Sequence, residues 1–468
     1  MFQLKRSASR SSTFAWLFED SHQPQNMPPP RDPERGLSGQ NGTNGTNGTN
    51  GVNGVNGHSN EHTPLLGSRV NTNDGFVKRH AKEGWNATMS VLTSNYVNVL
   101  LVFVPLGIIS GLFKWSAITV FTLNFLAIVP LAALLSYATE EISLYVGQTL
   151  GGLLNATFGN AVELIVSIVA LQKNEIRIVQ ASMLGSILSN ILLVLGCCFL
   201  FGGMKYKEQT FNSTVASTMS SLMAVAAGSL IIPAALYNSF NNNIDPIKNP
   251  DQYASHNASI LLLSRGASIV LLILYVLYLF FQLKTHTDLF SDEHDDEEEP
   301  ETPALSVWGA ALVLVLVTLM VAVCAEYLVD SIDSIVAETK ISKTFIGLIL
   351  LPIVGNAAEH VTAVVVATKN KMDLAIGVAI GSSLQIAILV TPFLVVLGWI
   401  MGREMSLFFQ TFETCVFFVS VLITNYLIQD GKSNYLEGAM LLGIYVIIAL
   451  SFYVYPDNEQ AHGPGFPL

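Results

Sequence analysis

The sequence feature that most constrains the fold is a succession of long apolar runs that begins at Tyr96. A membrane-spanning helix needs about 20 predominantly apolar residues. These runs are too long for buried strands and show no alternation of period two, so they predict helices. Only helices and closed barrels satisfy the hydrogen bonds of the backbone within lipid. We therefore expect an all-α, polytopic membrane protein with about eleven transmembrane helices, at residues 96–113, 116–138, 149–171, 178–201, 211–236, 260–283, 305–326, 342–368, 372–398, 411–428 and 435–455.

The charge content agrees with this class. Charged residues make up 12% of the chain, whereas a soluble globular protein carries about 25%. Much of the charge is clustered, since residues 288–301 hold 9 of the 35 acidic residues. No basic stripe is present, so we expect no nucleic-acid partner. All four cysteines lie in apolar stretches without the spacing of metal ligands, which predicts buried thiols at Cys197, Cys198, Cys324 and Cys415.

Composition also suggests boundaries along the chain. Residues 1–90, with an Asn-Gly-Thr repeat at 41–57, have a composition that cannot bury a core and are expected to be disordered. Lys78, Arg79 and Lys82 precede the first helix and favour a cytosolic N-terminus. We expect the first transmembrane helix at 91–115, a five-helix unit at 116–285, an acidic cytosolic linker at 286–304, a second five-helix unit at 305–455 and a tail at 456–468.

The two five-helix units repeat each other. The segment GNAVELIVSIVA from Gly159 resembles GNAAEHVTAVVVA from Gly355, 196 residues later, and GSILSN from Gly185 resembles GSSLQI from Gly381 at the same offset. An odd number of membrane crossings separates the two GNA helices, so they run in opposite directions. The sequence therefore predicts one extra helix plus two inverted five-helix repeats. Inverted repeats are typical of secondary transporters, which bind their substrate near the midplane between the halves.

The repeated helices each contain one glutamate, Glu163 and Glu359. An ionised carboxylate inside a bilayer costs at least about 3 kcal/mol, and apart from Lys343 at the start of the second run these helices contain no Lys or Arg that could balance it. The carboxylates must therefore hold a proton, a cation, or both in turn. Asn160 and Asn356 lie three residues earlier, on the same helix face. Two carboxylates balance a divalent charge, and calcium takes six to eight oxygen ligands.

Further oxygens are available nearby. Backbone carbonyls would contribute if the helices break near Gly159 and Gly355, as helices often do at transporter sites. His360, next to Glu359, is a candidate proton-linked group, although a structural histidine is the alternative. The glutamates themselves could instead be protonated packing residues, and Gly185 and Gly381 could serve only close helix packing. The following helices add side-chain oxygens at Ser186, Ser189, Ser382, Ser383 and Gln385, while Glu140, Glu326, Glu413 and Arg265 fall near helix ends, where snorkelling or a vestibule role is expected.

GNAVELIVSIVAL and GNAAEHVTAVVVA resemble the paired signature motifs of the cation/proton exchanger family of calcium/cation antiporters, and the resemblance covers about residues 86–455. Fungal and plant vacuolar calcium/proton exchangers are its best-known members. The resemblance implies calcium uptake across the vacuolar membrane into an acidic compartment, driven by the proton gradient. It implies that Glu163 and Glu359 bind calcium in alternation with protons, without an organic cofactor. An oligomer is compatible with the sequence.

Three other functions remain as alternatives. A sodium/calcium exchanger of the same superfamily would carry Thr-Ser and Pro before the acid, where this chain has GNAVE and GNAAE. A divalent cation channel is the second alternative. An intramembrane enzyme could use two acids, but the Tyr-Asp and Gly-x-Gly-Asp motifs of aspartyl proteases do not occur, so we expect no enzyme. For the acidic run, including Glu297, Glu298 and Glu299, we expect a regulatory role, with a solvated linker as the alternative.

Overall fold

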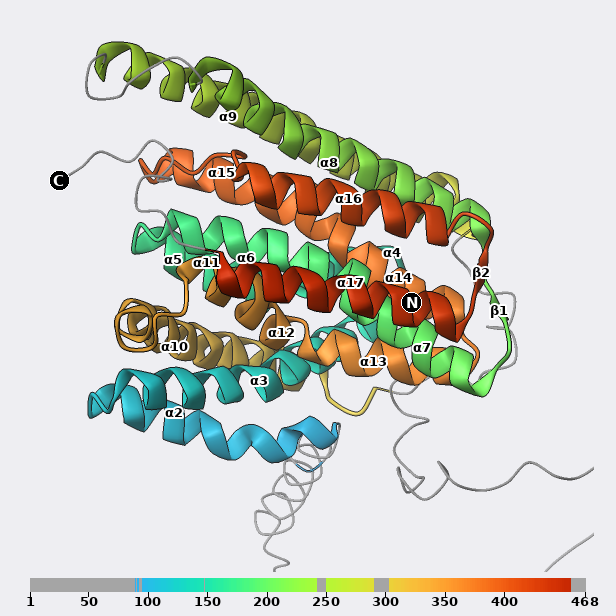
Figure 1. Cartoon of the computed structure of the whole chain (residues 1–468). Coiled ribbons are helices and arrows are strands. Elements are labelled where there is room, and N and C mark those ends of the chain that lie inside the picture. Colours follow the sequence, from blue (N-terminus) through green and yellow to red (C-terminus); the bar gives the residue numbers. More distant parts are fainter. Residues whose placement is uncertain are drawn as a thin grey trace, which may run out of the picture. The chain divides into compact units, whose positions relative to one another are not determined.

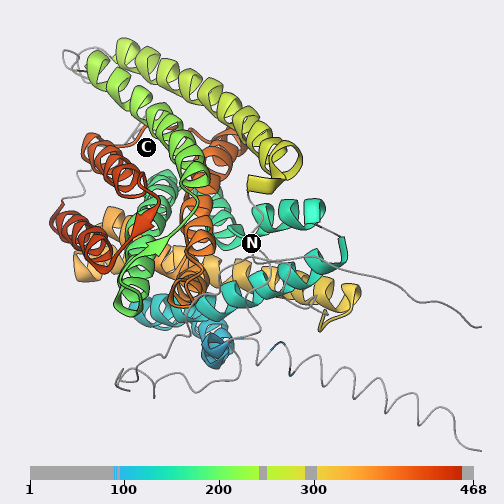
Figure 2. The ribbon, with the colours of Figure 1, turned by 90° about the vertical axis from the view of Figure 1, so that its right-hand side faces the viewer.

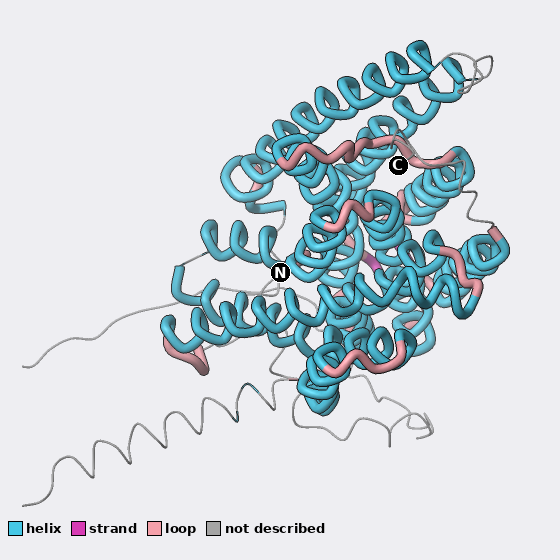
Figure 3. The backbone as a smooth tube through the Cα atoms, turned by 90° about the vertical axis from the view of Figure 1, so that its left-hand side faces the viewer, coloured by secondary structure: helices cyan, strands magenta, loops and turns pink. Residues whose placement is uncertain are grey.

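The computed structural model describes residues 95–146, 148–241, 250–289 and 303–455, together with Met89 and Val91. The Asn-Gly-Thr repeat, Glu297, Glu298 and Glu299 lie outside these residues. The described chain is almost entirely helical, as predicted (Figure 3). Two short strands, β1 (Gln209–Thr210) and β2 (Lys432–Ser433), pair antiparallel, with Gln209 opposite Ser433. They join two loops that are far apart in the sequence.

The helices follow one another with short connections. The part before the acidic linker contains η2 (Tyr96–Val102), α2 (Phe103–Leu112), α3 (Ala117–Val146), α4 (Gln148–Phe158), α5 (Ala161–Gln172), α6 (Ile176–Leu188), η3 (Ser189–Val194), α7 (Leu195–Lys205), α8 (Ser213–Asn241), α9 (Pro250–Phe280), η4 (Phe281–Thr285) and η5 (Thr287–Leu289). The part after it contains α10 (Val307–Thr339), α11 (Lys343–Phe345), η7 (Ile346–Leu350), α12 (Leu351–Gly355), α13 (Ala357–Thr368), α14 (Met372–Gln385), η8 (Ile386–Val390), α15 (Thr391–Ile400), α16 (Thr411–Leu427) and α17 (Tyr435–Val454).

Every apolar run of the sequence is helical. Within the described residues, seven helices are long and apolar enough to cross a membrane, and the bent pair Lys343–Gly355 and Ala357–Thr368 makes an eighth candidate. Tyr96–Leu112, Ala161–Gln172 and Thr411–Leu427 are shorter apolar helices. These segments together account for the eleven predicted runs. The polytopic helical class is confirmed, while the number of eleven crossings remains a prediction.

The helix bounds repeat at the offset seen in the sequence. Helix α13 has the same bounds as α5 shifted by 196 residues, and α6–η3–α7 is matched by α14–η8–α15, each with a π-helical segment in its middle. The Lys343 ammonium lies 3.2 Å from a Glu175 carboxylate oxygen, so α5 ends where α11 begins. Lys205 at the end of α7 donates to the Thr368 carbonyl over 3.0 Å, so α13 ends at the opposite end of the bundle. Helices α5 and α13 therefore run in opposite directions, as an inverted repeat requires.

These contacts define two ends of the bundle. We call one the α5–α6 end and the other the β1–β2 end (Figure 1). Helices α3 and α10 pack along each other with α2 beside them, while α8 and α9 lie on the opposite side of the bundle (Figures 1 and 2). Many apolar side chains on α9 and α10 are exposed, which is the expected surface of helices that contact lipid.

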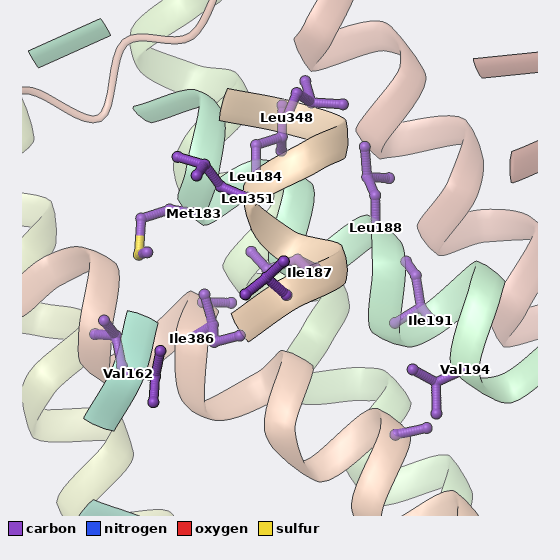
Figure 4. Packing of buried hydrophobic residues seen from close by; sticks show 14 of the residues in the cluster. Val162, Met183, Leu184, Ile187, Leu188, Ile191, Val194, Leu348, Leu351 and Ile386 are labelled. Atoms are coloured by element: carbon purple, nitrogen blue, oxygen red, sulfur yellow. The ribbon is translucent and has the colours of Figure 1, made fainter. Parts of the chain in front are cut away.

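The core lies where the two halves meet. Leu184 of α6 packs near Leu348 of η7 and Leu351 of α12, and Ile386 of η8 completes this part of the core (Figure 4). A Cβ atom added to Gly185 would clash with the carbonyl oxygen of Leu348. Glycine at this position therefore lets the backbones of the two halves approach closely, which confirms the packing interpretation of Gly185.

The prediction for the cysteines was only partly correct. Cys198 and Cys324 are buried and Cys197 is partly buried, and all four thiols are free. Cys415 is exposed, so the prediction was wrong there. An apolar run in a membrane protein has an outer face that contacts lipid, and hydropathy alone does not distinguish this face from the inner one.

Candidate cation site

Both GNA segments break their helices. Helix α4 ends at Phe158 and α5 begins at Ala161, while the axis bends by 56° between α12 and α13. Asn160 and Asn356 occupy the N-cap positions, yet neither side chain caps its own helix. Breaks near Gly159 and Gly355, the condition under which backbone carbonyls could contribute oxygens, are thus present. A break leaves carbonyl oxygens without helical partners at the end of one segment and exposes the positive end of the next helix. Glu163 and Glu359 lie in the first turns of α5 and α13, where this positive helix end stabilises a carboxylate.

Glu163 is buried against the other half of the protein. Its side chain is 5% exposed, and a Cβ atom added to Gly355 would lie 2.8 Å from its Oε1 atom. Among the described residues, no Lys or Arg forms an ion pair with Glu163. A small cavity lies beside this carboxylate. It is lined by residues of α3, α5, α6, α10 and α12, namely Ile128, Val162, Glu163, Val166, Ser182, Ser186, Leu328, Leu351, Val354 and Gly355.

A chain of hydrogen bonds crosses between the halves at Asn160. The Asn160 amide nitrogen donates to Gln385 Oε1 over 2.8 Å, and the Ser382 hydroxyl donates to Asn160 Oδ1 over 2.8 Å. Asn190 of η3 donates to the Ser382 hydroxyl over 3.1 Å. The structure therefore brings together Asn160 and Gln385, two of the predicted ligands. Asn190 was missed by the sequence reasoning, although it ends the repeated GSILSN segment.

The equivalent asparagine of the second half is bonded differently. The Asn356 amide nitrogen lies 3.4 Å from the Ser186 carbonyl oxygen. Asn356 Oδ1 and the Ser186 hydroxyl are buried and find no hydrogen-bond partner among the described residues. A buried polar atom without a partner costs about 1–3 kcal/mol. Such oxygens need an explanation in a native core, and an ion is one of the recognised explanations.

The remaining predicted residues lie around this centre with different roles. The Ser189 hydroxyl lies 3.4 Å from His360 Nε2, again across the two halves. Glu359 is half-buried on the next turn after Asn356 and is not part of the cavity lining beside Glu163. The Ser383 hydroxyl donates to the Ala379 carbonyl of its own helix over 2.9 Å, which directs it to the backbone instead of the site. A Cβ atom at Gly159 would meet only Asn155 of its own segment.

One helix-end acid proved to have a structural role. Glu413 is fully buried and forms a bidentate ion pair with Arg177, with Arg177 Nη1 lying 3.0 Å from Glu413 Oε2. Arg177 also donates to the Thr344 hydroxyl over 3.0 Å. The expectation of snorkelling or a vestibule role for Glu413 was therefore wrong. The pair joins α6, α11 and α16 at the α5–α6 end.

The donor set restricts the kind of cation. Within the described residues, no group of three or more His, Cys, Asp or Glu side chains is arranged to hold a metal ion. A cation bound here would be held by carboxylates together with neutral amide, hydroxyl and carbonyl oxygens. Hard divalent cations such as calcium prefer this set, whereas soft metals select thiolates and imidazoles.

Comparisons with known proteins agree with the geometry. The model of the sodium/calcium exchanger protein family matches residues 116–284 and 309–454, which nearly coincide with the two predicted repeats. A vacuolar calcium ion transporter of Schizosaccharomyces pombe is 51% identical over 399 residues, which are 85% of this chain and 94% of the relative. The vacuolar cation/proton exchanger 2 of Arabidopsis thaliana is 44% identical over 384 residues, which are 80% of this chain and 85% of that protein.

A solved structure shows the same fold. The crystal structure of the selenium-substituted Ca²⁺/H⁺ antiporter protein YfkE superposes with a TM-score of 0.62 at 37% sequence identity. The superposition covers 76% of this chain and 98% of YfkE. With two matched halves, relatives above 40% identity and this shared fold, the chain belongs to the sodium/calcium exchanger protein family and, within it, to the cation/proton exchangers.

Proposed function

We propose that this chain is a calcium/proton antiporter that moves cytosolic calcium into an acidic organelle by alternating access. The observation that carries this proposal is the environment of Glu163. Its buried carboxylate lies against Gly355 of the other half, and no cationic side chain of the described residues pairs with it. Asn356 Oδ1 and the Ser186 hydroxyl have no hydrogen-bond partner in the same part of the chain. The names of the relatives, a calcium ion transporter and a cation/proton exchanger, support the same pair of ions.

The ligands that we assign come from both halves. Glu163 and Glu359 supply the charge, and Asn160 and Asn356 supply amide oxygens. Backbone carbonyls at the breaks, next to Gly159 and Gly355, and the side chains of Ser189 and Gln385 complete the set, with His360 as the proton-linked neighbour. Because the set draws on α5 and η3 of one half and on α13 and α14 of the other, a shift between the halves changes both the geometry of the site and its access.

Coupling follows from competition for the same carboxylates. A carboxylate that holds a proton cannot also offer its charge to calcium. At the acidic side, protons bind and displace calcium; at the cytosolic side, where the pH is higher, protons leave and calcium binds. Each pH unit of gradient supplies about 1.4 kcal/mol per proton. The protein is on this proposal a transporter and not an enzyme, with calcium and protons as its substrates and no organic cofactor.

The orientation that we propose places the β1–β2 end in the cytosol and the α5–α6 end in the lumen of the vacuole. The first described helix begins after the basic residues Lys78, Arg79 and Lys82, which favour the cytosol. The basic residues Lys173, Arg177, Lys340 and Lys343 would then lie on the lumenal side, against the usual charge rule. Three of these residues, Lys173, Arg177 and Lys343, form ion pairs with acidic residues at that end, which gives them a structural role there.

Uptake into vesicles tests this function. Purified protein in liposomes with an acidic interior should accumulate ⁴⁵Ca²⁺ above the external concentration. An ionophore that dissipates the pH gradient should abolish the accumulation, and Glu163→Gln should do the same. Accumulation driven by an outward sodium gradient without a pH gradient would instead favour a sodium/calcium exchanger. Calcium that only equilibrates across the membrane would favour a channel and contradict the proposal.

A further inference from the structure

The last third of α10 is tied to the rest of the bundle by two lysines. Lys173, just after α5, pairs with Asp330 and also donates to the Glu326 carbonyl over 3.1 Å. Lys343, the first residue of α11, lies 2.5 Å from an Asp333 carboxylate oxygen and 3.2 Å from Glu175. Both ties lie at the α5–α6 end.

The position of these ties relative to the cavity suggests what they do. Leu328 of α10 and Ile128 of α3 line the cavity beside Glu163 together with residues of α5, α6 and α12. Lys173 holds α10 at Glu326 and Asp330, which lie two residues before and two residues after Leu328. The lysine therefore fixes the stretch of α10 that forms the wall of the cavity.

We propose that Lys173 and Lys343 form a latch that holds α10 against α5, α6 and α11 and keeps the cavity closed toward the α5–α6 end. Release of the latch lets α10 move away from this end and opens the cavity to it. The proposal rests on the alternating access of the proposed function and adds the element that controls one of its two openings.

The exposure of the two aspartates explains why the ion pairs of the latch can break and re-form. The side chains of Asp330 and Asp333 are 58% and 66% exposed, and exposed ion pairs shift an equilibrium by no more than about fivefold each. In the neighbouring pair the Glu413 side chain is fully buried and the Arg177 side chain is 19% exposed, and removing the partner of a buried charge is far more costly. At the α5–α6 end, α6, α11 and α16 are thus held together by a strong ion pair, whereas α10 is held to this end by weak, exposed ion pairs.

Two substitutions on α10 release the latch selectively. Asp330→Asn with Asp333→Asn removes both pairs, while Lys343 keeps Glu175 and the pair of Arg177 and Glu413 is untouched. Glu338→Gln is the matched control, because Glu338 is an exposed carboxylate near the end of the same helix that has no ion pair among the described residues.

Access to the cavity can be measured directly. Ser182, which lines the cavity and is buried, is replaced by Cys in a chain whose native cysteines are Ser. A membrane-impermeant, positively charged methanethiosulfonate reagent is applied to the α5–α6 end in oriented proteoliposomes without calcium. We expect the double variant to be labelled about two- to twentyfold faster than the parent, given the upper limit for two exposed pairs, and the Glu338→Gln control to match the parent. The native cysteines to be replaced are Cys197, Cys198, Cys324 and Cys415.

A charge swap completes the test. Lys173→Asp alone should raise the labelling rate, and adding Asp330→Lys should return it toward that of the parent, since the pair is re-formed with reversed polarity. An unchanged rate in the double asparagine variant, or no recovery in the swap, would overturn the latch. Labelling requires no calcium transport, so a chain that failed to exchange calcium for protons would refute the proposed function and leave this test intact.

Discussion

Replacing Gly355 by Ala tests the contact that this glycine makes with Glu163 of the other half. The added Cβ would lie 2.8 Å from Glu163 Oε1, 3.2 Å from its Cδ and 3.4 Å from its Cγ. Ordinary contacts of this kind begin near 3.4 Å, so the carboxylate must move by about half an ångström. Because the obstacle is the end of a side chain and not backbone, the carboxylate shifts and the fold survives.

The expected consequence is a loss of calcium affinity. A hydrogen bond or contact to a charged group contributes about 1.5–3 kcal/mol. Losing roughly half of one such contact would cost about 0.8–1.5 kcal/mol, which is about a four- to twelvefold rise in the calcium concentration for half-maximal uptake. Gly355→Val should be worse, because its two extra methyl groups also fill the cavity beside Glu163.

The assay is proton-driven ⁴⁵Ca²⁺ uptake into liposomes over a range of calcium concentrations, with the amount of inserted protein measured in parallel. Gly443→Ala is the matched control, because a Cβ atom at Gly443 meets nothing within 4 Å. It should have wild-type affinity. If Gly355→Ala also kept wild-type affinity, Glu163 would not need its observed position, and the argument that calcium binds between these two breaks would be wrong.

Three further predictions concern the charges. Glu163→Gln and Glu359→Gln should each abolish exchange while the protein still inserts; uptake near the wild-type rate in either variant would contradict a site shared by both glutamates. Arg177→Met should lower thermal stability in detergent by several degrees or more, because it leaves Glu413 buried without its partner at a cost of about 3–5 kcal/mol, and an unchanged melting temperature would refute this. Neutralising residues 297–299 should change the calcium dependence of uptake without abolishing it; an unaltered dependence would favour a solvated linker, and complete loss in an inserted protein would give the linker a larger role.

Local pattern was enough to predict the helices and the breaks. The apolar runs exceed the length of any strand, so every one of them is helical, and the repeated GNA segments mark both interruptions. The sequence also singled out Asn160 and Gln385 as candidate oxygen ligands in repeated segments, and the structure joins these two residues by a hydrogen bond. What no pattern revealed was the direction of each side chain. Ser383 and Ser382 are neighbours of the same type, yet only Ser382 bonds to Asn160.

The wrong predictions for Glu413 and Cys415 have the same cause, because a local pattern does not reveal the direction in which a side chain points. Glu413 was expected near a helix end with access to water, but the fold places Arg177, 236 residues earlier, against it and buries the carboxylate. Cys415 was expected inside, and it lies on an outer face. Both outcomes depend on which helix packs beside which, and this information is not contained in the hydropathy of a single segment.

The sequence by itself determined the membrane class, the repeat and the residue types of the site, because these follow from the cost of burying charge in lipid and from segments that can be compared directly. Tertiary structure alone decided the asymmetry of the site. Asn160 has both ends of its amide bonded across the halves, whereas Asn356 keeps an unbonded oxygen near Ser186. Two segments that share the GNA motif and its glutamate acquire different bonds because each packs against the other half, and the halves differ at Asn190 and Ile386. A local pattern cannot encode that difference, since it arises only when the two halves meet.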